Sequence, residues 1–293
     1  MGQNYINKIY LYFVLTTNVC TLKENNSYFN NKNKIMNKKE LIKYLDEYLN
    51  ISEYTDDSKN WLQIDSSKEE IKKIWYAVDS SSYIFDKAVE KWVDMVISHH
   101  WLFWWFEQVL VWLPYVRAKK MIENDIASYA CHLPLDAHKE VGNNAWLMKA
   151  FINIFGLQEW EYEVLDFCEY KWNTIWFWLR FDKAVHISNL VTPYAEQMQL
   201  LKKLYNFWNK DYINSIAFVS GWALSEVKKA KEENYDVLIT WEWVHHEMIL
   251  AKELEQSVLI WGHYETEKIW PKLLAYHLRD KFWLEIEFLD EKY

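Results

Sequence analysis

Apolar and polar positions follow two different rhythms along the chain from Met36 onward. Apolar residues that recur every three or four positions predict amphipathic helices, whereas short unbroken apolar runs predict buried strands. The helical rhythm covers residues 37–50, 81–92, 114–125, 143–156, 224–234, 243–256 and 265–280. The apolar runs cover residues 72–79, 93–98, 126–136, 213–220, 237–240, 257–261 and 284–290. Helices that alternate with strands in this way are typical of an α/β fold with mostly parallel strands.

A polar, acidic stretch around residues 158–163 separates two such series of elements. We therefore expect two α/β lobes with a boundary near residue 160. The first lobe covers residues 36–160 and the second covers residues 161–293.

Residues 1–35 differ from both lobes. The apolar segment Ile9–Leu22 is too short to span a bilayer, and the Asn/Lys-rich run that follows it lacks the apolar surface to fold. We interpret residues 1–35 as a disordered or wrongly annotated extension, with Met36 as the true start. A signal peptide is the alternative, although no convincing cleavage site is present.

Composition narrows the class of protein. A formal charge of −9 at pH 7 argues against a nucleic-acid partner, because the chain has no basic excess to displace the counterions around phosphates. Cys20, Cys131 and Cys168 show no paired spacing, so they form neither a disulfide framework nor a thiolate zinc site. We expect a cytoplasmic protein that acts on a small molecule and binds no membrane.

The balance of tryptophan and glycine is reversed, since the chain has 19 Trp and 5 Gly. Many of the tryptophans stand where chain reversals are expected and where glycine is usual. Our hypothesis is that the gene reads the codon UGA as glycine and was translated as if UGA meant tryptophan. Reading every Trp except Trp104, Trp160 and Trp243 as glycine brings glycine to about its usual 7%. A genuine Trp-rich binding surface is the alternative.

Candidate metal ligands follow the apolar run at residues 93–98, which leads directly into His99 and His100. Ligands gather at the carboxyl ends of strands in α/β folds. Adjacent residues of a strand end point in opposite directions, so this pair can serve two ions or two sides of one cleft. Two ordinary loop histidines are the alternative.

A second set of polar groups, His132, Asp136 and His138, ends the run at residues 126–136. Asp136 has two oxygens and can bridge two cations. A helix cap or turn role is the alternative for Asp136. For the two histidines, structural roles and ligation remain equally open.

A third set lies near the end of the chain, where His263 follows an apolar run and Glu267 comes four residues later. An acidic residue in a first helical turn is common for dipole reasons alone, which is the alternative for Glu267. Together the three sets offer nitrogen and oxygen ligands for two divalent ions such as zinc, manganese or iron. Such a centre activates water, and the implied chemistry is hydrolysis.

Glu242, His245 and His246 follow the apolar run at residues 237–240. Glu242 and His246 are candidates for general acid or base beside the metals. An exposed helix start with a capping carboxylate is the alternative.

These motifs resemble the Nif-three-like dinuclear metal-centre family, many of whose members are called GTP cyclohydrolase 1 type 2 homologues. The matching features are His99 and His100, LPLDAH at 133–138 and GHYETE at 262–267, within a resemblance that runs over about residues 37–293. The resemblance implies two α/β domains with the metals in the cleft between them, and a ring-like homo-hexamer. It assigns the metal role to His99, His100, Asp136, His263 and Glu267. The chain departs from the family pattern by Trp in place of Gly at Trp61, Trp101, Trp146, Trp222, Trp241 and Trp261.

The function expected from these features is a metal-dependent hydrolase in which activated water attacks a small nucleotide-like or phosphorylated substrate. The cyclohydrolase activity is implied by the resemblance alone, and the sequence has no phosphate-binding P-loop. The alternative is a non-catalytic metal-binding protein that acts as a scaffold or regulator.

Overall fold

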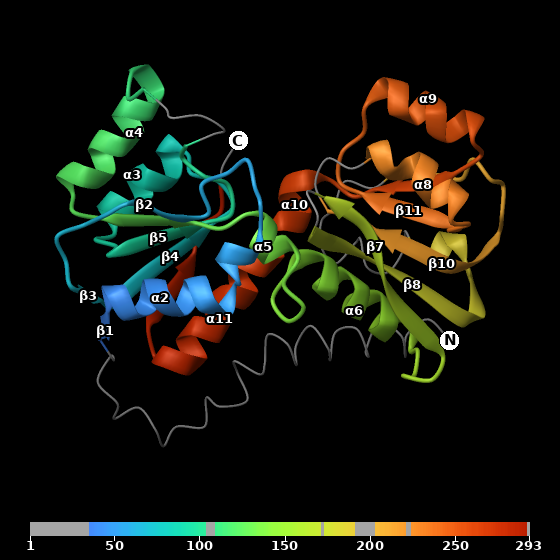
Figure 1. Cartoon of the computed structure of the whole chain (residues 1–293), viewed down its shortest axis with the longest axis horizontal. Helices are drawn as coiled ribbons and strands as arrows, with labels where there is room; N and C mark the ends of the chain where they lie inside the picture. Colours follow the sequence, from blue (N-terminus) through green and yellow to red (C-terminus); the bar gives the residue numbers. More distant parts are fainter. Residues whose placement is uncertain (1–34, 104–108, 171–172, 191–202, 221–223, 292–293) are drawn as a thin grey trace. The chain divides into compact units, whose positions relative to one another are not determined.

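The computed structural model describes residues 35–103, 109–170, 173–190, 203–220 and 224–291. They form two compact units that are not contiguous in the sequence (Figure 1). The larger unit comprises the described residues of 33–146, 166–176 and 263–293. The smaller unit comprises those of 147–165 and 177–262.

The larger unit is built on a five-stranded sheet in the order β13-β4-β5-β6-β2. The first four strands run parallel, and β2 pairs antiparallel with β6. Every residue of β5 and β6 is buried, which explains why both strands read as apolar runs. The strands are β13 (Glu285–Phe288), β4 (Lys73–Ala77), β5 (Met95–Ser98), β6 (Ala127–Ala130) and β2 (Trp61–Ile64).

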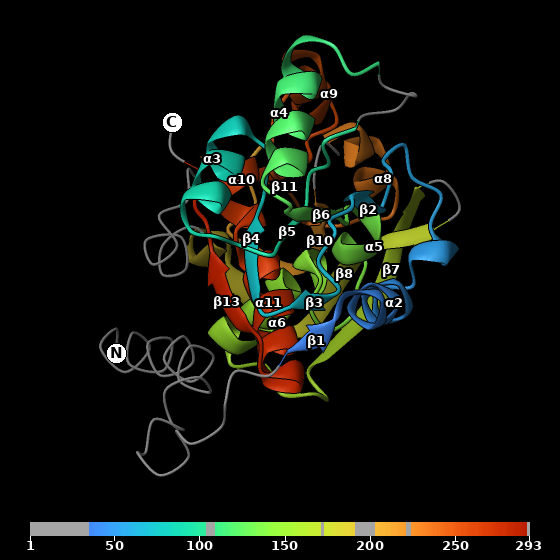
Figure 2. The ribbon, with the colours of Figure 1, turned by 90° about the vertical axis from the view of Figure 1, so that its left-hand side faces the viewer.

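Helices cover both faces of this sheet (Figures 1 and 2). α3 and α4 lie on one side, and α2 and α11 lie on the other. The short strands β1 (Met36–Asn37) and β3 (Glu70–Ile71) pair with each other. The helices are α2 (Lys38–Tyr48), η1 (Ile51–Glu53), α3 (Ser82–Glu90), α4 (Trp112–Glu123), α5 (Leu133–Asp136), α10 (His263–Glu267) and α11 (Ile269–Phe282).

The amphipathic rhythm of α3 and α4 supplies one side of the core. Phe85 and Met121 are fully buried and belong to one apolar cluster with Trp75 of β4 and Val96 of β5. Burying a large apolar side chain contributes roughly 1.5–3 kcal/mol. This packing holds the carboxyl ends of β4 and β5 in a fixed place.

A six-stranded sheet in the order β7-β8-β10-β11-β12-β9 belongs mostly to the smaller unit, whereas residues 166–170 of β7 and 173–176 of β8 group with the larger unit. The sheet strands β10, β11 and β12 are parallel, whereas β8 and β9 run antiparallel to their neighbours β10 and β12. The strands are β7 (Tyr162–Tyr170), β8 (Asn173–His186), β9 (Lys203–Tyr205), β10 (Tyr212–Phe218), β11 (Val237–Thr240) and β12 (Ser257–Ile260). The helical elements are η2 (Ile187–Leu190), η3 (Leu224–Glu226), α8 (Val227–Glu232), α9 (His245–Glu253) and α6 (Asn143–Phe155), of which α6 begins in the larger unit.

The predicted α/β class with parallel strands is confirmed. The predicted strand at residues 126–136 is wrong in its second half, because β6 ends at Ala130 and α5 follows. Pro134 stands in the first turn of α5, where its fixed φ suits a helix start and where a central strand would lack its N–H. The apolar segment Ile9–Leu22 and the Asn/Lys-rich run up to residue 34 lie outside the described residues.

None of the helices in the described ranges combines the length and the apolar character that crossing a bilayer requires.

Among the described residues, three tryptophans have the left-handed backbone that favours glycine. Trp92, Trp112 and Trp283 have φ values of 54°, 51° and 61°. Trp92 and Trp283 stand at the ends of α3 and α11, the helix position that glycine most often occupies. By contrast, Trp75 and Trp178 lie inside strands and do not have a positive φ, so their backbone gives no reason to expect glycine.

Candidate metal centre

Two adjacent parallel strands of the larger unit deliver the first candidate ligands. His99 and His100 follow β5, and His132 follows β6 after Cys131. Because β5 and β6 are parallel neighbours, their carboxyl ends lie at the same edge of the sheet. The backbone N–H of His99 donates to the Ala77 carbonyl and that of His100 donates to the Val78 carbonyl, which fixes the pair against β4.

The short helix α10 delivers His263 and Glu267 to the same group. The two residues are one helical turn apart, and His263 Nε2 lies 2.8 Å from Glu267 Oε1. Glu267 is 1% exposed, and its two carboxylate oxygens lie 3.5 Å from His99 Nε2 and 3.3 Å from His100 Nε2. One carboxylate therefore stands among three imidazoles.

Asp136, the last residue of α5, completes the group. Its Oδ2 atom lies 3.7 Å from His99 Nε2, and the residue is 4% exposed. The structure thus brings together all five residues that the sequence nominated as metal ligands, within one compact unit.

The pKa values of Asp136 and Glu267 are shifted in opposite directions. Burial raises the pKa of Asp136 to about 7, and the nearby Glu267 carboxylate adds to the increase. Burial also opposes ionisation of Glu267, but the positive potential of His100, His263 and His99 outweighs it and holds that pKa well below its usual value. At neutral pH, Glu267 is therefore the fixed negative charge of the group.

Three imidazoles of the group are oriented by acceptors behind them. The Nδ1 atom of His99 donates to the Cys131 carbonyl at 3.0 Å. The Nδ1 atom of His100 donates to Asp79 at 2.7 Å, and that of His132 donates to Asp56 at 3.2 Å. Carbonyl and carboxylate oxygens only accept hydrogen bonds, so in each neutral imidazole Nδ1 carries the proton and Nε2 carries the lone pair. This tautomer is the one that binds a metal ion through Nε2.

The sequence did not nominate Asp79 or Asp56. Asp79 had a usable signal, because it follows the strand-like run at the same edge as the histidines. Asp56 lies in an irregular loop, and nothing in the order of its neighbours distinguishes it.

The group fits a metal ion. Two overlapping trios, His99/His100/His132 and His100/His263/Glu267, each place their ligand atoms within 4.8 Å of one another. Within the described residues, the buried atoms Asp136 Oδ1 and Glu267 Oε2 accept no hydrogen bond. Buried oxygens normally have partners, and a cation supplies one. Imidazole nitrogen together with carboxylate oxygen suits zinc, iron or manganese.

The remaining candidates lie elsewhere. His138 uses both ring nitrogens on the backbone: Nε2 donates to the Tyr48 carbonyl, and Nδ1 accepts from Glu140 and Val141 N–H. His138 is therefore a structural residue of the turn after α5. Glu242, His245 and His246 are exposed around the start of α9, in the smaller unit.

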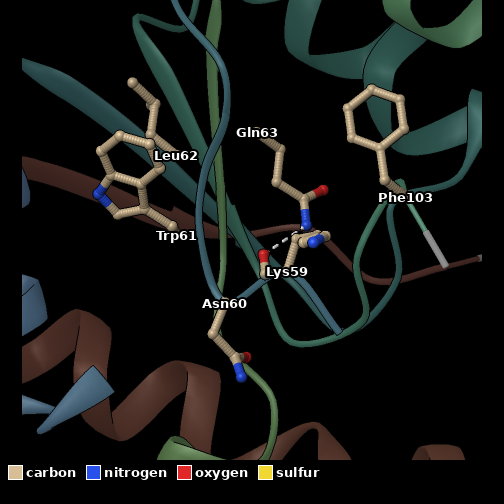
Figure 3. Close-up of a pocket in the computed structure, with 6 residues that line it drawn as sticks. All are labelled: Lys59, Asn60, Trp61, Leu62, Gln63 and Phe103. Atoms are coloured by element: carbon tan, nitrogen blue, oxygen red, sulfur yellow. Dashed lines mark hydrogen bonds between the residues drawn. The ribbon is translucent and has the colours of Figure 1, made fainter. Parts of the chain in front are cut away.

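An open pocket lies beside the start of β2 (Figure 3) and is lined by Lys59, Asn60, Trp61, Leu62, Gln63 and Phe103. Two of its side chains hold the loops that carry the histidines. Asn60 Oδ1 accepts from the His132 N–H and Gln63 Oε1 accepts from the Leu102 N–H, both at 2.7 Å. Trp61, 54% exposed, forms one wall. Because Trp61 is among the residues interpreted as glycine, we assign no ligand to this pocket.

Trp101 is the one tryptophan that packs against a candidate ligand among the ring contacts described. Its indole is 6% exposed and stands edge-on to the His132 ring, with centroids 4.4 Å apart. Trp261, which precedes His263 closely in the sequence, instead stacks on Phe151 in the smaller unit.

The fold and the site define the class: an α/β protein whose parallel strands present a buried imidazole and carboxylate group that fits metal ions. Residues 36–292 match the family model Duf34/NIF3 (NGG1p interacting factor 3). A Pyrococcus horikoshii protein named GTP cyclohydrolase 1 type 2 homolog is 36% identical over 87% of this chain and 98% of its own. A protein of the same name from Archaeoglobus fulgidus is 33% identical, and the match covers 87% of this chain and 98% of the Archaeoglobus protein. The solved structure of the protein ybgI, described as of unknown function, has a TM-score of 0.77 at 27% identity, covering 88% of this chain and 99% of its own.

The chain belongs to the Duf34/NIF3 family. The resemblance inferred from its motifs is thereby confirmed.

Proposed function

We propose that this protein is a metal-dependent hydrolase that holds two divalent ions and acts on a small nucleotide-like or phosphorylated substrate. The observation that supports the proposal most is the burial of Asp136 and Glu267 against His99, with two carboxylate oxygens that accept no hydrogen bond from the described residues. His99, His100, Asp136, His263 and Glu267 are the residues that would hold the ions.

A divalent ion supplies Lewis-acid chemistry, which polarises a substrate oxygen and activates water near neutral pH. The side chains contribute the rest. Glu267 and, once a bound ion displaces its proton, Asp136 would offer two negative charges, which is less than the charge of two divalent ions. The loaded site therefore stays positive and favours an anionic substrate such as a phosphate ester.

Glu242 and His246 are the proposed general acid and base. Both are exposed at the surface and thus open to substrate. Glu242→Gln is expected to slow turnover while leaving the metal content unchanged, because the carboxylate moves protons and binds no ion.

GTP is the first substrate to test, since the curated relatives are named GTP cyclohydrolase 1 type 2 homolog. Metal-loaded protein is incubated with GTP and a panel of phosphorylated nucleotides, with Glu267→Gln as the metal-deficient control. Consumption of one substrate by the wild type alone supports the hydrolase. Tight metal binding without turnover of any substrate favours the non-catalytic scaffold.

The proposed assembly is a homo-hexamer in the cytoplasm. The segment 109–116 ahead of and within α4 exposes apolar side chains, with Val109 74% and Leu113 49% exposed. Contiguous exposed apolar surface marks protein contacts. The free, buried Cys131 suits a reducing compartment. Light scattering tests the assembly, and Val109→Glu is expected to lower the mass of the particle.

We also propose that UGA encodes glycine in this gene. The left-handed backbone of Trp92, Trp112 and Trp283 supports glycine at those positions. The intact mass of protein made in its native translation system tests the proposal. A mass that matches tryptophan at all 19 positions would overturn it.

A further inference from the structure

We propose that residues 289–291 form a latch that fastens the short helix α10 to the core of the larger unit, and that α10 opens locally when this latch is released. The segment, called the 289–291 latch below, follows β13 and belongs to the same compact unit as α10. The inference goes beyond the proposed function, because it concerns a movement of the chain and needs no bound ion.

The position of α10 depends on contacts from outside the helix. α10 has five residues, and a helix of this length is not stable alone because its first turn costs more conformational entropy than its hydrogen bonds return. Glu267 at its end is 1% exposed, so a solute reaches that carboxylate only when the surrounding structure moves. A contact that fastens α10 therefore controls access to a buried charge.

Tyr264 in α10 joins the helix to the latch through its hydroxyl group. The hydroxyl donates to Asp290 Oδ1 at 2.8 Å and accepts from the Glu291 N–H at 2.5 Å. Lys268, the residue after α10, places its Nζ atom 3.8 Å from the same Asp290 oxygen. Both ends of α10 are thus tied to residues 290 and 291.

The other side of the latch is anchored to the sheet and to α3. The Leu289 N–H donates to the Tyr76 carbonyl at 2.7 Å, and the Leu289 side chain packs against the apolar cluster of β4, β5, α3 and α4. The Glu291 carboxylate accepts a hydrogen bond from Ser81 Oγ, which itself accepts from the Ile84 N–H at the start of α3. The latch therefore bridges α10 and the packed core.

The contacts between the latch and α10 are weak enough to be released. Water competes for the Asp290 carboxylate, whose side chain is 57% exposed, and salt screens its ion pair with Lys268. Tyr264 is also partly exposed, so water can replace the hydrogen bonds of its hydroxyl at little loss. Contacts of this kind open locally before the whole unit unfolds. Residues 290 and 291 can then separate from α10 while Leu289 stays packed.

Hydrogen exchange of the full-length protein, measured by mass spectrometry with and without a chelator, tests the proposal because it reports local opening. Tyr264→Phe removes the hydroxyl and keeps the ring. A second variant lacks residues 290–293 and keeps Leu289. Tyr83→Phe is the matched control, since Tyr83 is a partly buried tyrosine of the same unit whose ring centroid lies 6.0 Å from Lys87 Nζ.

Tyr264→Phe is expected to raise the exchange rate of residues 263–268 about 10-fold, because the lost hydrogen bonds shift the local opening equilibrium. The shortened chain is expected to exchange there at least as fast, whereas Tyr83→Phe should match the wild type. The exchange of β5 should be the same in all four proteins, which separates local opening from a general loss of stability.

If the shortened chain does not fold, as judged by circular dichroism, Tyr264→Phe decides alone. Wild-type exchange of residues 263–268 in the folded variants, with and without chelator, would overturn the latch. An equal rise in β5 would also overturn it, because the contacts would then stabilise the whole unit. A chelator without effect on any of the proteins would count against the metal centre and leave the latch standing.

Discussion

His99 Nε2 lies 3.5 Å from Glu267 Oε1, although the two residues come from opposite halves of the chain. The contact exists because α10 and α11 belong to the same compact unit as β5. A buried carboxylate is costly unless it is neutralised, and the three imidazoles around Glu267 lower that cost. The same contact places an anionic oxygen beside the ring nitrogen through which His99 would hold an ion.

Glu267→Gln is expected to remove at least one metal ion, because the amide keeps the shape of the side chain but loses its charge. The added metal should then no longer raise the melting temperature as it does in the wild type. Glu47→Gln is the control, since Glu47 forms an exposed pair with Lys43 in the same unit. Equal metal content in Glu267→Gln and wild type would exclude Glu267 as a ligand.

Asp94 makes stability depend on pH. Burial opposes its ionisation, but donors from Lys68, Lys72 N–H and Lys73 N–H outweigh burial and hold its pKa below the usual 3.8. A depressed pKa stabilises the fold above about pH 4, and this contribution disappears as the pH falls through the folded-state pKa. Asp94→Asn should cost about 1–2 kcal/mol at pH 7 and progressively less below pH 4.

Asp86→Asn is the control for Asp94, because Asp86 pairs with Lys120 at the surface and is 53% exposed. Thermal melts of both variants between pH 3 and pH 8 give the comparison. A loss in Asp94→Asn that stays constant over this range would show that its carboxylate charge is not the cause.

Gly142 allows the turn after α5 to close. A Cβ atom at this position would lie 2.2 Å from the His138 carbonyl oxygen and 2.7 Å from that of Leu135. Gly142→Ala must therefore shift the backbone next to Asp136, at a cost of about 1–3 kcal/mol, with weaker metal binding. Gly156→Ala meets open space but has a φ of +64°, so it should cost about 1 kcal/mol and leave metal binding unchanged. Similar metal affinity in both variants would contradict this role of Gly142.

Replacing tryptophan by glycine at left-handed positions should stabilise the chain. Trp92→Gly and Trp283→Gly are each expected to gain about 1 kcal/mol, because both residues are exposed and have positive φ. Trp160→Gly is the control, since Trp160 is 78% exposed without positive φ. Chemical denaturation measures all three, and a loss of stability in both left-handed variants would contradict the glycine interpretation.

The strand ends that carry the site could be predicted from sequence because β5 is an unbroken buried run that stops at a polar residue pair. The orienting residue Asp56 could not be predicted, since its role depends on a contact with His132 made only after folding. The long strand β8 was also missed. Its residues change from a buried run to exposed positions along one strand, so the sequence shows neither a continuous apolar run nor a regular alternation of apolar and polar residues over its whole length.

The grouping of elements into units could not be read from periodicity either. Hydrophobic patterns describe local structure, whereas the return of residues 263–293 to the larger unit depends on long-range packing such as β13 against β4. The sequence linked His263 and Glu267 with the earlier motifs through their ligand chemistry and their place after an apolar run, and the resemblance to a family supported that link.

The most direct test of the metal centre is the number of ions bound per chain in the wild type, His100→Ala and Asp136→Ala, measured by elemental analysis alongside the mass of the assembly. We predict about two ions in the wild type and the loss of at least one in each variant, with the assembly unchanged. A wild type without bound metal, or the same metal content in all three proteins, would contradict the assignment of this site.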